Sequence, residues 1–384
     1  MRNVAVVTGT RAEFGLLAPL MRKVRSSSSL NLQVIATGTH LLPEFGMTKN
    51  EITQMGFTID WEVSEIMRAL TPNDAARQVG FGIVGFTEAF QSLSPDVVTL
   101  LGDRYELLAA ATAAFFLGVP IVHLHGGEST QGAFDDAIRH AISQFSSLHA
   151  VAADEYADRV IRAGAAPKDV YVVGGFGIDS IHHAKRLTRL ELESDLGISM
   201  SEPLFLVTYH PVTSGPHDTL AETEALVHAL ESFPEATVVF TSPNADPEHH
   251  VIREVIQSNV RFNPNWHFFD SLGSEKYLSL VAEASVIVGN SSSGLMEAPA
   301  LGVPTVNIGP RQAGRLMAGS VLCCDPNEAE IARSILRACS PDFQESFGDM
   351  ENPYGKPGAS STVLNLLESA DFDSLLQVKS TCGD

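Results

Sequence analysis

An aspartate and an arginine stand side by side directly after an apolar run in the first half of the chain. Residues 96–101 read DVVTLL, Gly102 follows, and Asp103 and Arg104 come next. A neighbouring arginine favours the ionised form of a carboxylate and can fix its direction, as a general base requires. A buried structural ion pair is the alternative interpretation. We take Asp103 as a candidate catalytic residue and Arg104 as a candidate substrate-binding residue.

The next apolar run ends in two imidazoles and a carboxylate. Residues 123–128 read HLHGGE, and Asp135 follows at the start of a helical pattern. Such groups can move protons near neutral pH, which makes His125, Glu128 and Asp135 candidate catalytic residues. Paired histidines can also ligate a metal, but neither H-E-x-x-H nor a cysteine partner pattern is present, so acid/base chemistry is favoured.

A third histidine follows the first apolar run of the second half. Residues 204–208 read LFLVT, and His210 comes two positions later. A single histidine is more often a structural residue, and only its place after a strand makes it a candidate. At that place, His210 could assist proton transfer or hydrogen-bond a departing phosphate.

Two loops have the composition of phosphate sites. The loop 9–13, GTRAE, joins a glycine that can approach a phosphate to Arg11, although a tight turn with an exposed arginine is an equal alternative. The loop 288–294, VGNSSSG, places hydroxyls and backbone N–H groups where a helix should begin, and Glu297 could accept hydrogen bonds from ribose. Serine capping of that helix is the alternative. The candidate nucleotide-binding residues are Arg11, Asn290, Ser291, Ser292, Gly294 and Glu297.

Strands and helices must alternate along the chain to bring these positions together. Apolar runs alternate with helical patterns in both halves, with strands expected near 4–7, 30–36, 96–101, 119–124, 204–208, 237–240, 267–269, 286–288 and 305–308. This is typical of doubly wound parallel sheets, in which ligands meet the carboxyl ends of the strands. We predict two Rossmann-like α/β domains with a central cleft: 1–178 with the catalytic carboxylates, 179–365 for the nucleotide, and a tail, 366–384.

Composition narrows the class of partner. A chain of 384 residues usually forms two domains, and 46 acidic against 25 basic residues give a net charge of -21. That charge argues against nucleic acid or an anionic membrane as the main partner. The four cysteines lack paired spacing, and no segment resembles a secretory signal or a membrane span, so we expect a cytoplasmic protein.

Taken in order, the polar segments between about residues 4 and 365 resemble the hydrolysing UDP-N-acetylglucosamine 2-epimerases of sialic acid synthesis. The segments that carry the resemblance are 9–13, 102–104, 123–128, 135–140, 210–211, 289–294 and 311–315. The resemblance implies a GT-B-like fold, with the C-terminal helix returning to the N-terminal domain, and a homodimer or homotetramer. It implies that UDP-N-acetylglucosamine and water give N-acetylmannosamine and UDP by elimination to 2-acetamidoglucal and hydration, without nicotinamide, flavin or metal.

The same resemblance assigns roles to single residues. It implies that Arg11, Ser291, Ser292 and Arg311 surround the diphosphate and that Glu297 binds the ribose, while Asp103, Glu128, Asp135 and His210 lie in the catalytic motifs. Some relatives carry Glu in place of His125, which leaves the base at that position open. Removing the C2 proton needs a positioned carboxylate, which Asp103 or Asp135 can supply, and expelling UDP needs the positive charge that Arg11 and Arg311 provide.

Four alternatives remain open at this point. The nearest is the same reaction on a UDP- or GDP-linked 2,4-diacetamido-2,4,6-trideoxyhexose of the legionaminic acid route (UDP- or GDP-N,N'-diacetylbacillosamine). A non-hydrolysing 2-epimerase and a GT-B glycosyltransferase share the expected fold. A non-catalytic nucleotide-sugar sensor is disfavoured, since it would have little use for the carboxylates and histidines at the strand ends.

Overall fold

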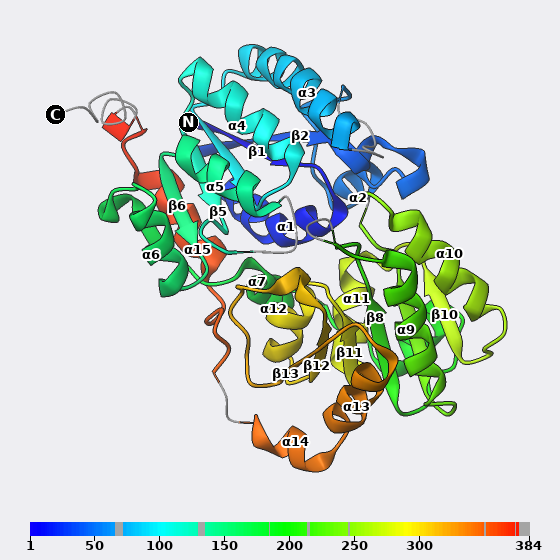
Figure 1. Cartoon of the computed structure of the whole chain (residues 1–384). Helices are drawn as coiled ribbons and strands as arrows, with labels where there is room; N and C mark the ends of the chain where they lie inside the picture. Colours follow the sequence, from blue (N-terminus) through cyan, green and yellow to red (C-terminus); the bar gives the residue numbers. More distant parts are fainter. Residues whose placement is uncertain are drawn as a thin grey trace. The chain divides into compact units, whose positions relative to one another are not determined.

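The computed structural model describes residues 1–65, 72–129, 135–183, 185–212, 216–244, 246–348, 351–372 and 374–375 (Figure 1). The chain forms two compact units, and each is described by itself. The first contains the chain up to Glu128, then Asp135–Ser180, and the chain from Gly355 onward. The second contains Ile181–Tyr354. Among the described residues, no helix has the length and apolar character needed to cross a membrane.

The first unit is a seven-stranded sheet in the order β3-β2-β1-β4-β5-β6-β7, with every pair parallel. Its strands are β1 (Arg2–Thr8), β2 (Leu30–Thr37), β3 (Trp61–Val63), β4 (Val97–Leu101), β5 (Ile121–Leu124), β6 (Leu148–Val151) and β7 (Val170–Val172). Its helices are α1 (Arg11–Ser26), α2 (Lys49–Gln54), α3 (Pro72–Leu93), α4 (Tyr105–Leu117), α5 (Asp135–Phe145), α6 (Asp154–Arg162), α7 (Phe176–His183) and α15 (Ala359–Ser369), with 3₁₀ turns η1 (Gly38–Leu41), η2 (Pro43–Phe45) and η3 (Pro167–Asp169).

Apolar side chains cover both faces of this sheet. Along β1, Val4 and Val6 join a core with α1 and α15, while Ala5 and Val7 join a second core with α3 and α4. Side chains on a strand point alternately to opposite faces, so a strand buried on both faces is apolar at nearly every position. This explains the uninterrupted run at residues 4–7 and leaves only the strand ends for polar chemistry.

The second unit is a six-stranded parallel sheet in the order β10-β9-β8-β11-β12-β13. Its strands are β8 (Leu204–Thr208), β9 (Thr237–Thr241), β10 (Trp266–Phe269), β11 (Val286–Gly289), β12 (Thr305–Ile308) and β13 (Val321–Cys324). Its helices are α8 (Arg189–Leu196), α9 (Thr219–Glu231), α10 (His249–Val260), α11 (Gly273–Glu283), α12 (Ser293–Ala300), α13 (Glu328–Ala338) and α14 (Pro341–Ser346), with the turn η4 (Pro310–Gln312). The expected pair of Rossmann-like α/β sheets is confirmed.

The C-terminal helix belongs to the first unit, which corrects the domain boundary predicted at residue 365. Val363 and Leu367 on α15 are fully buried in the core that contains α1, and α15 lies beside α1 (Figure 1). At the start of α15, the Asp179 carboxylate accepts hydrogen bonds from the backbone N–H groups of Gly358, over 2.5 Å, and Ser360, over 2.6 Å. Residues 355–365, which we predicted in the second domain, therefore complete the first, as the family resemblance implied.

Candidate active site

The candidate catalytic residues of the first unit follow two adjacent strands. Leu101 at the end of β4 is the register partner of Leu124 at the end of β5. The loops after them carry Asp103 on one side and the segment 125–128 on the other. Because parallel strands run in the same direction, both loops leave the same edge of the sheet, where ligands of such folds are met.

Arg139 lies between two of the candidate carboxylates. It comes from α5 and its side chain is only 2% exposed. One terminal nitrogen, Nη2, forms a close ion pair with Asp103 Oδ2, and the other, Nη1, lies 3.6 Å from Glu128 Oε2. The Glu128 side chain is 2% exposed and that of Asp103 is 17% exposed. The Asp103 carboxylate is thus held by a buried cation while part of its surface stays accessible.

His125 is fixed at both ring nitrogens. Its Nε2 accepts a hydrogen bond from the backbone N–H of Phe176 over 3.1 Å, so the ring proton resides on Nδ1. That Nδ1 lies 2.5 Å from Glu128 Oε1 and donates to it. A ring nitrogen that already accepts an N–H group is not available as a base. The geometry therefore favours a positioning role for His125, in place of the proton transfer that the sequence suggested.

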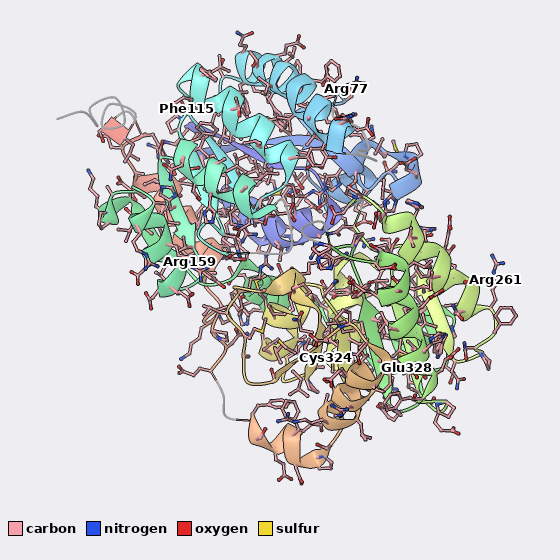
Figure 2. All side chains as sticks on the ribbon, viewed as in Figure 1. Arg77, Phe115, Arg159, Arg261, Cys324 and Glu328 are labelled. Atoms are coloured by element: carbon pink, nitrogen blue, oxygen red, sulfur yellow. The ribbon has the colours of Figure 1, made fainter. Side chains whose placement is uncertain are left out.

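The loop that carries His125 is tightly held. His125 has φ +62° and Gly127 has φ +76°, and a Cβ at Gly127 would lie 2.3 Å from the carbonyl oxygen of Tyr156. Only glycine fits that approach. From α6, Arg159, labelled in Figure 2, donates to the Gly127 carbonyl over 3.3 Å. These contacts fix the backbone on which Glu128 stands.

His123 is a structural support for the residue before Asp103. Its Nε2 lies 2.8 Å from the carbonyl oxygen of Gly102 and donates to it, while its Nδ1 lies 3.0 Å from the Ser143 hydroxyl. The side chain is fully buried, and burial lowers the pKa of His123 to about 4. His123 is therefore neutral near pH 7 and holds the backbone at the end of β4.

The expected pairing of Asp103 with Arg104 is wrong. The partner of Asp103 is Arg139, whereas Arg104 forms an ion pair with Glu106, with 3.3 Å between its Nε and Glu106 Oε2. Glu106 is fully buried, and its charge acts on Glu13. Burial, and then the nearby Glu106 carboxylate, raise the pKa of Glu13 to about 7. The side chain of an arginine beside an aspartate in sequence can point away from it, which the sequence pattern does not reveal.

The first loop uses its backbone N–H groups internally. Glu13 Oε2 accepts from the N–H of Gly9 over 2.8 Å and from that of Thr10 over 3.1 Å, and Thr10 caps α1 in return. This is a capping box, which satisfies the donors that a phosphate would need. Arg11 follows at the first position of α1.

In the second unit, Asn290 and His210 are joined at two adjacent strand ends. Asn290 Oδ1 accepts from the backbone N–H of His210 over 2.7 Å, and Asn290 Nδ2 donates to the carbonyl of His210 over 2.9 Å. The Asn290 side chain is fully buried. We predicted that Asn290 binds the nucleotide, but these contacts show that its amide fixes the loop that presents His210.

In the loop 288–294, called the serine loop here, the Ser292 hydroxyl does not cap the following helix. Ser292 has helical backbone angles, φ -61° and ψ -23°, and its side chain makes no capping hydrogen bond. Ser292 therefore does not cap the helix, whereas the Ser291 hydroxyl accepts from the backbone N–H of Ser293, the first residue of α12, over 3.4 Å. Gly294 serves packing, because a Cβ there would lie 2.6 Å from Thr305 Cγ2. Glu297 follows on α12 and is 8% exposed.

Arg311 lies beside this loop. Its Nη1 is 3.5 Å from the carbonyl oxygen of Asn290, and its Nη2 is 3.5 Å from Asp246 Oδ2. Gln312 donates from Nε2 to the same Asn290 carbonyl over 2.7 Å. The turn η4 thus braces the loop after β11, and Arg311 lies beside the serine loop within this unit.

The structure gathers the predicted residues into two groups, one in each unit. The first joins Asp103, Glu128 and His125, with Asp135 four residues before Arg139 on α5. The second joins His210, Asn290 and Arg311 with the serine loop. Sequence analysis gave no role to Arg139, although it lies in the segment 135–140 that carries the family resemblance. Within the described parts of the chain, no cluster of His, Cys, Asp and Glu has the arrangement to hold a metal ion.

Comparison with known proteins identifies the family. A family model described as UDP-N-acetylglucosamine 2-epimerase matches residues 22–368. The chain is 37% identical over 350 residues to a GDP/UDP-N,N'-diacetylbacillosamine 2-epimerase (hydrolyzing) of Campylobacter jejuni, covering 90% of this chain and 89% of that protein. It is 33% identical over 384 residues to a UDP-N,N'-diacetylbacillosamine 2-epimerase (hydrolyzing) of Legionella pneumophila, covering 100% and 99%.

Solved structures of low sequence identity share the fold. The S. aureus MnaA structure with UDP matches with a TM-score of 0.81 at 17% identity, covering 96% of both chains. A Methanocaldococcus jannaschii UDP-GlcNAc 2-epimerase in complex with UDP-GlcNAc and UDP matches with a TM-score of 0.79 at 17% identity, covering 96% of this chain and 100% of that one. The family model and the two relatives show that the chain belongs to the UDP-N-acetylglucosamine 2-epimerase family, within its hydrolysing branch, and is an enzyme that acts on a nucleotide sugar.

Proposed function

We propose that this enzyme is a hydrolysing 2-epimerase of a UDP-linked 2,4-diacetamido-2,4,6-trideoxyhexose, and that it releases UDP and the free sugar inverted at C2. Support for the sugar comes from the names of the Campylobacter and Legionella relatives, at 37% and 33% identity. This reverses the order of substrates expected from the sequence, where UDP-N-acetylglucosamine stood first. The GDP-linked sugar belongs in the same test, because the Campylobacter relative is named for both nucleotides.

The observation that carries the proposed chemistry is the pairing of Asp103 with buried Arg139 in a site where the Asp103 side chain is still 17% exposed. In the proposed reaction, Asp103 takes the proton from C2 as the bond from C1 to the UDP oxygen breaks. The electron pair of the C2–H bond forms the C1–C2 double bond, and UDP leaves with the pair of the broken bond. Water then adds hydroxyl to C1, and C2 receives a proton on the opposite face. An ionised carboxylate with an accessible oxygen suits the first step.

We propose that the second unit binds the nucleotide. Support comes from Arg311, whose guanidinium lies at the loop after β11, and from the hydroxyls of Ser291 and Ser292 before α12. An arginine and a helix N-terminus both favour a diphosphate and stabilise the charge that it gains on departure. Glu297, one turn into α12, is assigned to the ribose hydroxyls by the resemblance. Arg11 in the first unit is proposed as a further diphosphate ligand.

UDP-N-acetylglucosamine is the second candidate substrate. A Neisseria meningitidis serogroup B protein named UDP-N-acetylglucosamine 2-epimerase is 30% identical over 348 residues, covering 88% of this chain and 88% of that protein. A relative at this identity favours the reaction type without separating two sugars that differ at C4 and C6. N-acetylmannosamine would be the product in that case. The dimer or tetramer that the resemblance implies stays a prediction.

The test is a proton NMR time course in D₂O with each nucleotide sugar alone. We expect UDP release from the UDP-linked diacetamido sugar, with a free sugar inverted at C2 and deuterium in place of the C2 proton. Turnover of UDP-N-acetylglucosamine only would move the assignment to the second candidate. An epimerised sugar still attached to UDP would mean a non-hydrolysing reaction. Absence of UDP release from every nucleotide sugar would overturn the proposal.

A further inference from the structure

One arginine that neither the sequence nor the family resemblance gave a role bridges the two candidate carboxylates. Arg139 is 1% exposed and offers its two terminal nitrogens to different partners, Asp103 and Glu128. A guanidinium is planar and always charged, so its donors have a fixed mutual direction. Two carboxylates held by one such fork keep a set distance and orientation relative to one another.

The bridge is anchored to the backbone at both of its ends. Beyond Glu128, His125 donates to the carboxylate from Nδ1 and accepts the Phe176 N–H at Nε2. Beyond Asp103, His123 donates to the carbonyl of the preceding residue, Gly102. Because both histidines are tied to main-chain groups, the two carboxylates that Arg139 contacts are supported by fixed backbone.

The charge of Arg139 also matters for its neighbours. Two carboxylates that share a site disfavour each other's ionised form, and a cation between them relieves that effect. Beside the bridge, the titratable groups that act electrostatically on His123 are His125, Glu128 and His140. Only Arg139 contacts both Asp103 and Glu128 with a permanent positive charge among the ion pairs described around them.

We propose that Arg139 is a positioning residue that makes Asp103 and Glu128 work as one unit: it aims the Asp103 carboxylate at the substrate and fixes it relative to Glu128. The residue acts through Asp103 and does not contact the substrate. This inference rests on the proposed function, because it assigns the proton transfer to Asp103. It goes further in naming the side chain on which that transfer depends.

The test is a double-mutant cycle in the full chain, with kcat and KM measured by UDP release. We expect Arg139→Met to lower kcat by about 100-fold, the loss that a small misplacement of a reacting group causes, with KM changed less than threefold. In an Asp103→Asn background, the same substitution should lower kcat by less than about threefold, because residues that act as a unit are not additive. Arg139→Lys keeps the charge without the fork and should fall between, near tenfold.

The control is Arg25→Met in the same unit. Arg25 packs its guanidinium on Phe57 and donates to the Gly56 carbonyl over 2.5 Å, so the substitution removes an arginine side chain, here an exposed one, that is not among the candidate site residues. Its kcat should stay unchanged. If Arg139→Met fails to fold, the cycle is run with Arg139→Lys, whose smaller loss should likewise vanish in the Asp103→Asn background.

Three results would overturn the inference: an unchanged kcat in Arg139→Met, a rise in KM alone, or an undiminished 100-fold loss in the Asp103→Asn background. The first would mean that the bridge has no effect, and the others that Arg139 acts on the substrate directly. The failure of the proposed function looks different, since the unmutated enzyme would then release no UDP. Even so, the urea midpoints of the four proteins in the cycle would still report whether Asp103 and Arg139 are coupled.

Discussion

The backbone N–H of Asn244 donates to Nδ1 of His210 over 3.0 Å. This hydrogen bond occupies one ring nitrogen, so in the neutral ring the proton resides on Nε2. Nε2 is therefore the nitrogen through which His210 can donate to a phosphate oxygen or exchange a proton. The two ring nitrogens of His210 therefore have different roles: Nδ1 holds the loop, and Nε2 is assigned to the reaction.

Amide side chains at position 210 test this separation. The side-chain oxygen of an asparagine can accept the Asn244 N–H in place of Nδ1. The free energy of unfolding of His210→Asn should therefore lie within about 1 kcal/mol of that of the unmutated enzyme. It removes Nε2, so kcat should fall by about 100-fold, the usual lower range for loss of a general acid or base. Urea unfolding and the rate of UDP release measure the two effects. A normal kcat in His210→Asn would remove Nε2 from the reaction.

Three buried groups, His40, His123 and Glu13, should determine how the free energy of unfolding changes with pH. Burial lowers the pKa values of His40 and His123 from 6.5 to about 4. Between pH 4 and pH 6.5 the unfolded chain binds protons that the folded chain does not. The contribution of each histidine to the free energy of unfolding is therefore greatest above pH 6.5. It is lost as the pH falls toward 4, by up to about 3 kcal/mol.

Glu13 acts in the opposite direction. Burial, and then the charge of Glu106, raise its pKa from 4.5 to about 7, so its contribution is full below pH 4.5 and is lost as the pH rises through 7. Glu13→Gln removes this opposing term. From pH 5 to pH 7, the free energy of unfolding of Glu13→Gln should therefore rise by about 2 kcal/mol more than that of the unmutated enzyme.

Urea titrations at pH 5 and pH 7 measure the difference. Glu88→Gln is the matched control, because Glu88 is an exposed glutamate on α3 of the same unit. Its pH dependence should equal that of the unmutated enzyme. If Glu13→Gln and Glu88→Gln gave the same pH dependence, Glu13 would not be protonated in the folded state near neutral pH.

Much of the fold could be predicted because its signals are local. Strands buried on both faces, such as β1 and β4, are continuous apolar runs, and the chain between them has helical spacing. Short elements escaped the same reasoning. The strand β3 has three residues with Glu62 at its centre, and β13 with α13 follows the last strand that we predicted.

The candidate site was predictable in its positions and not in its pairings. Polar residues after strands were identified from sequence because the carboxyl edge of a parallel sheet is where they act. The partner of Asp103 is 36 positions away on another helix, and its neighbour Arg104 pairs with Glu106. Such choices depend on how helices pack over the sheet, and no local pattern encodes them. The same holds for the Asn290 side chain, whose partners lie 80 positions away.

Gly294 is predicted to be required for packing. A Cβ at this position would lie 2.6 Å from Thr305 Cγ2, and Thr305 is itself held by a 2.8 Å hydrogen bond to the Gly294 carbonyl. Gly294→Ala should therefore destabilise by about 2 kcal/mol, as overpacking of a buried site does. Gly80, inside α3, has nothing within 4 Å of an added Cβ. Gly80→Ala should stabilise by about 0.5–1 kcal/mol.

Thermal unfolding of Gly294→Ala and Gly80→Ala tests whether position 294 requires glycine for packing or for phosphate binding. A large loss of stability in Gly294→Ala without UDP supports packing. An Ala variant that is as stable as the unmutated enzyme, yet binds UDP more weakly by isothermal calorimetry, would mean that the glycine serves the ligand.

The hydrogen bonds between Asp179 and the start of α15 should contribute strongly to the stability of the first unit. Its carboxylate is fully buried and accepts from the N–H groups of Gly358 and Ser360, at the N-terminal end of the helix. Asp179→Ala leaves the buried N–H of Ser360 and the partly buried N–H of Gly358 without this acceptor, and a buried unsatisfied donor costs about 1–3 kcal/mol. Ser360 and the buried face of α15 should then exchange amide hydrogens faster, together with α1, against which α15 packs.

Hydrogen exchange followed by mass spectrometry can localise this effect. Peptides from α1 and α15 should lose protection in Asp179→Ala, whereas peptides from β8 and β11 of the second unit should keep theirs. Asp195→Ala is the control, since Asp195 is an acidic residue on α8 whose described partner is Lys276. Uniform loss of protection across both units would contradict the prediction, because it would mean that Asp179 supports the whole chain and not the attachment of one helix.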